Sequence, residues 1–474
     1  MNLAPDLAGF KRLARKGNLI AVSASIPADL ETPVSAFLKL AASAPHAFLL
    51  ESAEQNETIG RYSFIGLEPA EIVTSEKYRG QDILSVLENK LSRFKLANPE
   101  SLPNFCGGFI GYLSYENVQR FENIRLKEKP GIDFPEAIFF LSQELLIFDH
   151  FRKMLSFVIL VNGGKDAAYQ SAKRKIDAYI QKLKRPLRVS AAKKSSKELK
   201  FQSNTKHGDF LKKVRKIKEY VRAGDCIQVV LSQRFKFPKI EDDFRIYRAL
   251  RSINPSPYMF YFRSGKNRLI GSSPELLVKK EKQRVEVRPI AGTRPRGGTT
   301  AEDLAHEESL KKSPKEMAEH LMLVDLGRND LGRVCKFDTI RVGNFARVER
   351  YSHVMHLVSD VTGTLKSGQS SFDLLRATFP AGTVSGAPKI RAMQIINELE
   401  PEKRGPYAGC LGYFSFNHDM DMCITIRTMI LDGKNIYLQA GAGIVKDSQP
   451  ESEYQETMNK ARALFKALAK AGDF

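Results

Sequence analysis

Two pairs of glutamates with the same spacing are the residues of this sequence best suited to chemistry. Glu316 and Glu319 lie in KEMAEHLMLVDLGRND, and Glu453 and Glu456 lie in ESEYQETMNKARALFKAL. Residues three apart share one face of an α-helix. If the two faces meet across a cleft, the four carboxylates form a site that suits a hard divalent cation such as Mg²⁺. Alternatively, the glutamates only complement the helix dipole in a first helical turn.

A second group of segments is suited to holding an anion. The stretch VEVRPIAGTRPRGG, residues 285–298, runs from alternating apolar residues into a basic loop. Its arginines are Arg288, Arg294 and Arg296. This loop is either a nucleic-acid surface or the rim of a pocket for a small anion. Two glycine-rich loops, 381–393 and 439–448, match neither a Walker loop nor a dinucleotide-binding loop. Each is therefore an anion cradle built from backbone N–H groups or a tight turn.

Single polar residues in apolar segments are further candidates. His353 and His356 lie three residues apart in a predicted strand and face opposite sides, so a shared metal is not expected. A histidine facing a cleft would accept a proton, whereas a core histidine would bond to the backbone. Arg427 lies in the apolar run DMCITIRTMI. Its burial is costly unless the guanidinium meets a carboxylate of the protein or an anionic substrate.

Composition narrows the function classes. The chain has 474 residues, a formal charge of +20 and 42% hydrophobic residues, which indicates a globular protein of two or three domains or of one large domain with a second woven onto it. Five dispersed cysteines without a CxxC pair predict a reducing compartment. No apolar run is long enough for a bilayer and no signal peptide is evident, so we expect a soluble cytoplasmic protein without a membrane partner. The Lys/Ser-rich stretch 182–200 lacks aromatic residues, which makes nucleic-acid binding a minor alternative.

The elements that must position these residues are apolar strands interrupted by whole helices. In the N-terminal part we expect a helix at 33–43 and strands in HAFLLES, RYSFIGL, AIFFL and MLSFVILV. After a helix that stops at Gly224 and a strand in CIQVVLSQRFKF, further strands are predicted at 258–263, 268–272, 284–290, 351–362, 408–417, 422–430 and 435–440. Helices are predicted at 243–252, 315–327, 371–378, 387–398 and 451–471. This order predicts an α+β fold, in which the basic linker 181–204 separates residues 1–180 from residues 205–474.

Several segments, in this order and spacing, resemble the chorismate-utilising enzymes. The segments are PIAGTRPRG, AEHLMLVDLGRNDLGRV, YSHVMHLVSDVTGTL, FPAGTVSGAPKIRAM, RGPYAGCLGYFSF, CITIRT and QAGAGIVKDSQPESEYQETMNKA. IQVVLSQRF, NPSPYMFYF and FLLESAEQNETIGRYSFIG extend the resemblance to nearly the whole chain. It implies stacked antiparallel β-sheets flanked by helices, with residues 1–180 as a regulatory region woven onto a catalytic domain at 205–474. It also implies Mg²⁺-dependent chemistry on chorismate.

The resemblance assigns roles by position in the motifs. Glu319 and Glu456 match metal ligands, with Glu316 and Glu453 supporting the metal through bound water. The matching substrate-binding positions are Gly292, Thr293, Tyr407, Arg427, Gly441, Ala442 and Gly443. The matching catalytic positions are His356 as a base in the elimination, Glu275 as the group that protonates the departing hydroxyl, and Thr383 in the active-site loop.

Ala291 distinguishes between close relatives. Family members that make aminodeoxychorismate, isochorismate or salicylate carry a lysine here, which attacks C2 of chorismate or activates water there. Alanine leaves C2 open to external ammonia. The resemblance therefore implies that ammonia adds at C2, the C4 hydroxyl leaves and pyruvate is eliminated to give anthranilate, the first step of L-tryptophan biosynthesis. An aminodeoxychorismate synthase is disfavoured, whereas an enzyme that stops at the aminated intermediate, an aminodeoxyisochorismate synthase, stays open.

The implied reaction needs an ammonia source, and the resemblance also implies an inhibitor. The chain lacks a glutaminase signature, since Cys106 in NFCGGF has none of the surrounding motif. The resemblance therefore implies a separate glutamine amidotransferase subunit. It also implies inhibition by L-tryptophan, bound between the N-terminal region and the PSPYM stretch. The matching positions are Glu51, Ser52, Pro257, Tyr258 and Met259. As alternatives, LLES is a strand end and NPSPYM a proline turn.

Overall fold

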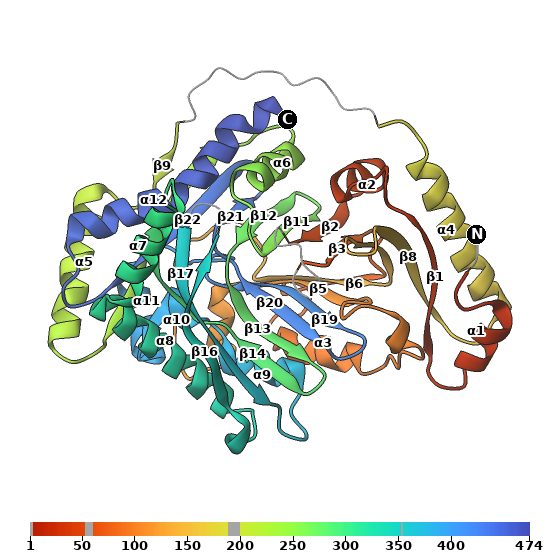
Figure 1. Ribbon diagram of the computed structural model, residues 1–474, viewed down its shortest axis with the longest axis horizontal. Helices are drawn as coiled ribbons and strands as arrows, with labels where there is room; N and C mark the ends of the chain where they lie inside the picture. The colour runs from red at the N-terminus through yellow and green to blue at the C-terminus, as the bar shows by residue number, and fades with distance from the viewer. Residues whose placement is uncertain (1–2, 53–59, 188–199, 352–353) are drawn as a thin grey trace.

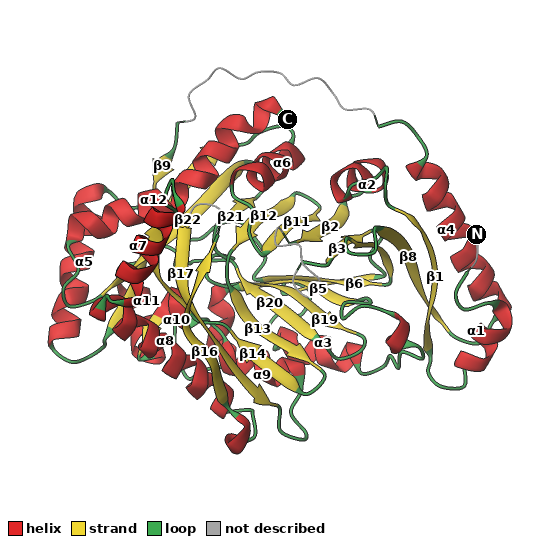
Figure 2. Cartoon of the chain, viewed as in Figure 1, coloured by secondary structure: helices red, strands yellow, loops and turns green. Residues whose placement is uncertain are grey.

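The strands of the computed structural model, which describes residues 3–52, 60–187, 200–351 and 354–474, form two large antiparallel β-sheets. Helices cover the sheets and lie between their strands in sequence (Figures 1 and 2). The predicted α+β class with stacked antiparallel sheets is confirmed.

The first sheet has twelve strands in the order β1-β8-β7-β3-β2-β11-β12-β21-β22-β10-β18, with β9 paired to β10. Their bounds are β1 Leu19–Pro27, β2 His46–Glu51, β3 Tyr62–Gly66, β7 Glu144–Asp149, β8 Met154–Asn162, β9 Gln202–Ser203, β10 Gln228–Pro238, β11 Tyr258–Ser264, β12 Asn267–Ser273, β18 Gly386–Ala387, β21 Thr428–Leu431 and β22 Asn435–Ile444. Strand β2, from the N-terminal part, pairs with β11, which lies beyond the basic linker.

The second sheet has ten strands in the order β15-β17-β14-β13-β20-β19-β5-β6-β4, with β16 paired to β17. Their bounds are β4 Glu71–Thr74, β5 Gly108–Leu113, β6 Ala137–Ser142, β13 Leu276–Glu281, β14 Arg284–Val287, β15 Ile290–Pro295, β16 Arg341–Arg350, β17 Val354–Thr364, β19 Cys410–Ser415 and β20 Met420–Ile424. Here β5 pairs with β19, so this sheet also contains strands from both sides of the linker.

The helices pack mainly on the outer faces and around the edges of the sheets (Figure 2). Their bounds are α1 Leu7–Leu13, α2 Pro33–Leu40, α3 Ile83–Leu91, α4 Asp166–Leu183, α5 His207–Arg222, α6 Asp243–Ile253, α7 Thr300–Lys311, α8 Pro314–Gly332, α9 Ser371–Thr378, α10 Gly382–Ser385, α11 Lys389–Leu399 and α12 Pro450–Lys470, with 3-10 turns at Pro99–Ser101, Tyr115–Arg120, Phe337–Thr339 and Ala471–Asp473. Within the described ranges, no helix combines the length and apolarity that crossing a bilayer requires.

The first sheet is buried on both faces, which explains its uninterrupted apolar runs. In β8, Leu155 and Phe157 pack into a core shared with α2, α4 and α12. Their neighbours Val158 and Leu160 point the other way, into the core shared with the second sheet. Successive side chains of a strand alternate between its faces, so a strand between two cores is apolar at nearly every position.

One predicted strand is wrong, because its residues divide between the two sheets. We expected a single strand at 422–430, but the chain leaves the second sheet after β20 and enters the first sheet at β21. Arg427, at this crossing, has φ +50°, a left-handed conformation that is rare outside glycine. The apolar residues on either side belong to two sheets, and for that reason the run looked continuous. The predicted strand 284–290 likewise divides into β14 and β15.

A buried ion pair lies beneath the junction of the two sheets. Arg404 and Glu400 have side chains that are 1% and 4% exposed, and Arg404 Nη2 lies 2.6 Å from Glu400 Oε1. Arg404 also donates to the carbonyl oxygens of Val384 at 2.7 Å and Val230 at 2.8 Å. Glu400 accepts from the backbone N–H of Ser232 at 2.9 Å. The pair therefore joins β10 to the loop that contains α10.

Replacing Glu400 by alanine is expected to lower the free energy of unfolding by about 3–5 kcal/mol, because it leaves the Arg404 guanidinium buried without its carboxylate. Urea denaturation followed by circular dichroism measures this change. Glu308→Ala is the matched control, since Glu308 forms an exposed pair with Lys312 whose side chains are 65% and 74% exposed. The control should leave stability nearly unchanged. Equal decreases in the free energy of unfolding of the two variants would contradict the greater importance of the buried pair.

Candidate active site

Helices α8 and α12 bring the two glutamate pairs within electrostatic reach of each other, which is the condition on which the expected metal site depends. Burial raises the pKa of Glu319 on α8, and the carboxylates of Glu316 and Glu456 raise it further. Burial also raises the pKa of Glu453 on α12, again with a contribution from Glu456. Four carboxylates from two helices therefore face one another closely enough to interact electrostatically.

All four carboxylates already have a partner, which for Glu453 is the Ser448 side chain. Glu316 Oε1 lies 3.2 Å from Arg294 Nη1. Glu319 Oε1 accepts a hydrogen bond from Gln228 Nε2 at 3.0 Å, and Glu456 Oε1 lies 2.6 Å from Lys460 Nζ. Among the residues that the structure describes, no three His, Cys, Asp or Glu side chains are grouped as a ready metal site. The donors are nonetheless all carboxylate oxygens, and this chemistry fits a hard divalent cation such as Mg²⁺.

His356 lies on β17 beside the loop that carries Ala291. Its Nδ1 is 2.8 Å from the carbonyl oxygen of Gly292 and 3.2 Å from Thr293 Oγ1. A carbonyl can only accept, so Nδ1 carries the proton and Nε2 is left as the proton acceptor. Burial lowers the pKa of His356, which keeps the ring neutral at neutral pH. The other candidate, His353, lies outside the described residues.

A bulge in β15 creates this contact. Ala291 pairs with Leu357, but the register shifts between Ala291 and Arg294, so Gly292 and Thr293 bulge from the ladder. Gly292 has φ +61°, and a Cβ on it would lie 2.8 Å from a methyl group of Leu310. Glycine is therefore required at this bulge. Ala291 itself is buried, with 6% of its surface exposed.

The side chains of Glu275 and Thr383 interact with each other. Burial raises the pKa of Glu275 to about 8, and the neighbouring Thr383 side chain opposes this shift. The Thr383 hydroxyl is buried and makes no hydrogen bond of regular geometry to another described residue. A carboxyl group in such a setting keeps its proton at neutral pH, so it is available as a general acid.

Arg427 and Tyr407 face the glycine-rich strand β22. Burial lowers the pKa of Arg427, while Tyr407 and Glu456 oppose the shift. Arg427 donates to the carbonyl oxygen of Lys460 at 2.9 Å, and within the described chain no carboxylate lies within salt-bridge distance of it. A guanidinium without an ionic partner favours the substrate-carboxylate interpretation over a structural ion pair. Strain at its positive φ is typical of functional sites.

The glycines of β22 allow close approach by neighbouring side chains. A Cβ on Gly441 would lie 2.8 Å from the Tyr407 hydroxyl, and one on Gly443 would lie 2.4 Å from Gln228 Nε2. Ala442 between them points into the core formed with α5 and α11. Strand alternation thus turns both glycines toward the site.

Two residues at this site were missed from the sequence. Gln228, at the start of β10, bonds to Glu319. Lys460, one turn after Glu456, also donates to the carbonyl oxygen of Gly441 at 3.0 Å. The i, i+4 spacing of Glu456 and Lys460 was visible in the sequence, whereas the position of Gln228 depends on strand pairing.

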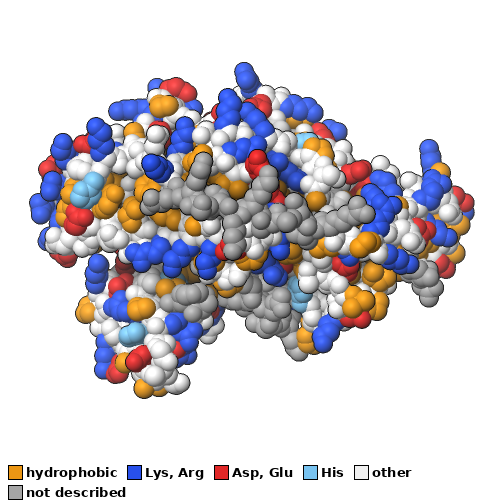
Figure 3. Space-filling view, turned by 90° about the horizontal axis from the view of Figure 1, so that it is seen from above, with side chains coloured by type: hydrophobic (Ala, Val, Ile, Leu, Met, Phe, Trp, Pro, Cys, Tyr) orange, Lys and Arg blue, Asp and Glu red, His pale blue; other side chains and the backbone are white. Residues whose placement is uncertain are grey.

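The arginines of the loop at 285–298 have protein partners. Arg288 Nε lies 3.0 Å from Asp360, and Arg296 Nη2 lies 2.6 Å from Asp303. Arg294 pairs with Glu316. These ion pairs favour the pocket rim over a free nucleic-acid surface. Figure 3 likewise shows Lys and Arg side chains dispersed among acidic and hydrophobic ones on the face seen from above.

The predicted inhibitor residues meet where β2 pairs with β11. Glu51 lies opposite Met259 in this pairing, Ser52 follows β2 and Pro257 precedes β11. The Glu51 carboxylate accepts a hydrogen bond from Tyr247 and lies 3.1 Å from Arg251 Nε. The Tyr258 hydroxyl donates to Asp421 at 3.0 Å, which connects β11 to β20 of the second sheet.

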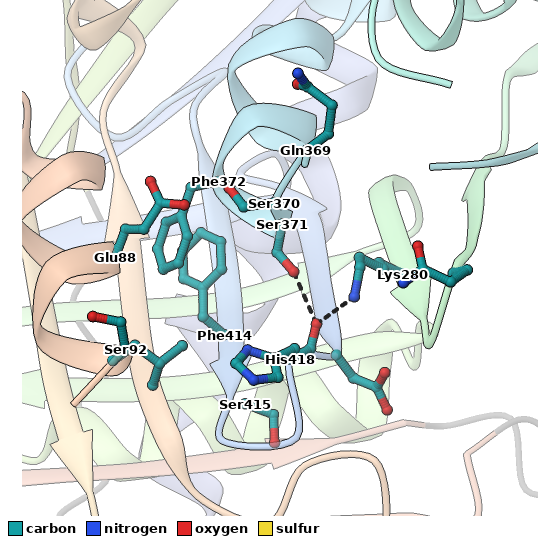
Figure 4. Close-up of a pocket in the computed structure, with 13 residues that line it drawn as sticks. Glu88, Ser92, Lys280, Gln369, Ser370, Ser371, Phe372, Phe414, Ser415 and His418 are labelled. Atoms are coloured by element: carbon teal, nitrogen blue, oxygen red, sulfur yellow. Dashed lines mark hydrogen bonds between the residues drawn. The ribbon is translucent and has the colours of Figure 1, made fainter. Parts of the chain in front are cut away.

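A separate cavity of about 340 Å³ opens between α3, α9 and the hairpin from β19 to β20 (Figure 4). Its floor includes Phe372 and Phe414, and the ammonium of Lys280 and the hydroxyl of Ser371 both donate to the carbonyl oxygen of His418. None of the candidate residues lines this cavity.

Comparisons with known proteins identify the family of the chain. The family described as chorismate binding enzyme matches residues 45–466. The chain is 45% identical to anthranilate synthase component 1 of Acetivibrio thermocellus, with 99% of each chain covered. It is also 45% identical to the protein of that name from Aquifex aeolicus, covering 99% of this chain and 98% of the relative. The crystal structure of anthranilate synthase component I from Streptococcus pneumoniae superimposes with a TM-score of 0.77 at 35% identity, covering 93% of this chain and 99% of that one. The chain belongs to the family of chorismate-binding enzymes.

Proposed function

We propose that the protein converts chorismate and ammonia into anthranilate and pyruvate. The observation that carries this proposal is the meeting, in one site, of four glutamate carboxylates with the Arg427 guanidinium, which has no ionic partner among the described residues. The cluster suits a divalent cation, and the guanidinium suits a carboxylate of the substrate. Ala291 and the names of the relatives favour anthranilate as the product.

The residues of the site divide the chemistry between them. Mg²⁺ held by Glu319 and Glu456, supported by Glu316 and Glu453, would polarise a bound carboxylate. Arg427, the Tyr407 hydroxyl and the backbone at Gly441–Gly443 would orient the carboxylates of chorismate, with Gly292 and Thr293 forming one wall.

We assign two proton transfers to Glu275 and His356. The nitrogen of ammonia bonds to C2 while the C4–O bond breaks, and the Glu275 carboxyl gives its proton to the departing oxygen, which leaves as water. The ammonium group formed at C2 releases one proton to become the amine. His356 Nε2 then takes the proton from C2, the C3–O bond breaks, and the enolpyruvyl group leaves as pyruvate after gaining a proton. Thr383, beside Glu275, would help to position the carboxyl. The second transfer completes the aromatic ring, and without it the aminated intermediate would accumulate.

We also propose a partner subunit, an inhibitor, a division of the chain and a cellular compartment for this reaction. A glutamine amidotransferase subunit would supply ammonia, and L-tryptophan would bind at the pairing of β2 with β11. Residues 1–180 would then serve regulation, 181–204 would be a linker, and 205–474 would carry the catalysis. The five cysteines are all free and buried, which supports a reducing compartment such as the cytoplasm.

Purified protein given chorismate, Mg²⁺ and an ammonium salt should form anthranilate, detected by its fluorescence, and EDTA should stop the reaction. Glu456→Gln should lower kcat more than about 100-fold because a metal ligand is lost. The matched control is Glu451→Gln on the same helix, whose exposed carboxylate pairs with His207. Activity that is indifferent to EDTA, or equal losses in both variants, would contradict the metal assignment.

The pH dependence should report Glu275. Its pKa of about 8 means that the donating, protonated form is lost as pH rises through 8, so kcat should fall there. The rates are compared at a fixed concentration of free NH₃, which removes the titration of ammonium. Glu275→Gln should lower kcat by about 10²–10⁴-fold and abolish this fall, whereas Glu281→Gln, at the far end of β13, should keep it. A wild-type profile that is flat between pH 7 and 9 would argue against Glu275 as the acid.

L-tryptophan should inhibit the wild-type protein, and Glu51→Gln should raise the inhibitor concentration for half-inhibition about tenfold or more. The reason is that the substitution removes a charged partner from the proposed pocket. The measurement is anthranilate formation at increasing L-tryptophan. Glu68→Gln, an exposed glutamate of the same region, should behave like wild type. If Glu51→Gln is inhibited as strongly as wild type, the pocket lies elsewhere.

A further inference from the structure

Lys460 holds a position that the catalytic scheme does not explain. It lies on α12 one turn after Glu456, and its ammonium is 2.6 Å from Glu456 Oε1. The same ammonium donates to the carbonyl oxygen of Gly441 on β22 at 3.0 Å. A Glu–Lys pair at this spacing is common on helix surfaces and contributes little to stability. The second contact, to a strand of the site, distinguishes this pair from an ordinary surface pair.

The charge of Lys460 reaches the other groups of the site. Burial raises the pKa values of Glu319, Glu453 and Glu275, and Lys460 opposes each of these shifts. Burial lowers the pKa of His356, and Lys460 adds to that shift. These groups come from four different segments of the chain: α8, α12, β17 and the residue before β13. A single ammonium therefore lies within electrostatic reach of all of them.

The contacts of Lys460 are those that a metal ion would make. A carboxylate and a backbone carbonyl are both hard oxygen donors of the kind that Mg²⁺ binds. Two cations cannot share one carboxylate oxygen without strong repulsion. The Lys460 side chain is 38% exposed, so the ammonium can turn into solvent without disturbing the core.

We propose that Lys460 is an internal cation that competes with the divalent cation for Glu456 and thereby weakens metal binding to the free enzyme. This proposal rests on the proposed metal site. The ammonium lowers the repulsion among the four carboxylates, and a metal ion must displace it from Glu456 before binding there. Metal binding thus includes the cost of breaking the Glu456–Lys460 pair, and removal of the lysine charge should tighten it.

The test is Mn²⁺ binding to the enzyme without chorismate, measured from the electron paramagnetic resonance signal of free Mn²⁺. Lys460→Met should lower the Kd for Mn²⁺ about two- to fivefold, which corresponds to the loss of one partly exposed ion pair. Lys460→Arg keeps the charge and should bind Mn²⁺ as wild type does or more weakly. Lys466→Met, which removes an exposed lysine from the same helix, is the control and should leave the Kd unchanged.

A second readout separates competition from damage to the fold. Without metal, Lys460→Met should have a lower Tm than wild type, because the carboxylates lose their counter-charge, and added Mn²⁺ should raise its Tm by more than it raises that of wild type. Unchanged or weaker Mn²⁺ binding in Lys460→Met would overturn the proposal and leave the metal site standing. If wild type binds no Mn²⁺, or if Glu456→Gln binds it as wild type does, the metal site itself fails.

Discussion

The buried pair of Arg404 and Glu400 is the interaction on which the geometry of the site most depends. The Arg404 side chain is almost fully enclosed, and its guanidinium binds the Glu400 carboxylate and two backbone carbonyl oxygens. The backbone N–H of Arg404 donates to the Glu116 carboxylate, in the N-terminal part, at 2.7 Å. The guanidinium also lies over the rings of Tyr115 and Tyr407, at 4.9 and 5.5 Å from their centroids. Such a charge is tolerated in the core only while every partner stays in place. The pair therefore fixes β10, the loop of Thr383 and the ring of Tyr407 relative to one another.

The crossing of the chain between the two sheets is a second constraint on the geometry of the site. Strands β20 and β21 belong to different sheets, and the short connection between them places Arg427 at the junction, in a left-handed conformation. Helix α12 closes the same junction, because its Lys460 carbonyl accepts from Arg427 and its ammonium contacts Gly441. The chain passes from one sheet to the other at this junction, and candidate groups from both sheets and two helices therefore meet there.

Much of this site could be predicted from local pattern, and the rest depends on tertiary pairing. The spacing of Glu316 and Glu319, and of Glu453 and Glu456, was sufficient to place each pair on one helix face. Strand alternation indicated the apolar strands, but it could not show that the run around Arg427 divides between two sheets, because both halves are equally apolar. Gln228 was missed because its contact with Glu319 depends on the position of β10 beside β22, which no local pattern encodes. Strands from both sides of the linker pair within each sheet. Sequence periodicity could not predict this either, because it depends on tertiary pairing.

The most direct test of the central claim is the identity and isotopic composition of the aromatic product. Wild-type protein is incubated with chorismate, Mg²⁺ and ¹⁵N-labelled ammonium, and the products are analysed by mass spectrometry. The proposed roles, in which Ala291 leaves C2 open and His356 removes the C2 proton, predict anthranilate that carries one ¹⁵N atom together with an equal amount of pyruvate. Isochorismate, aminodeoxychorismate or an aminated product that retains the enolpyruvyl group would contradict it.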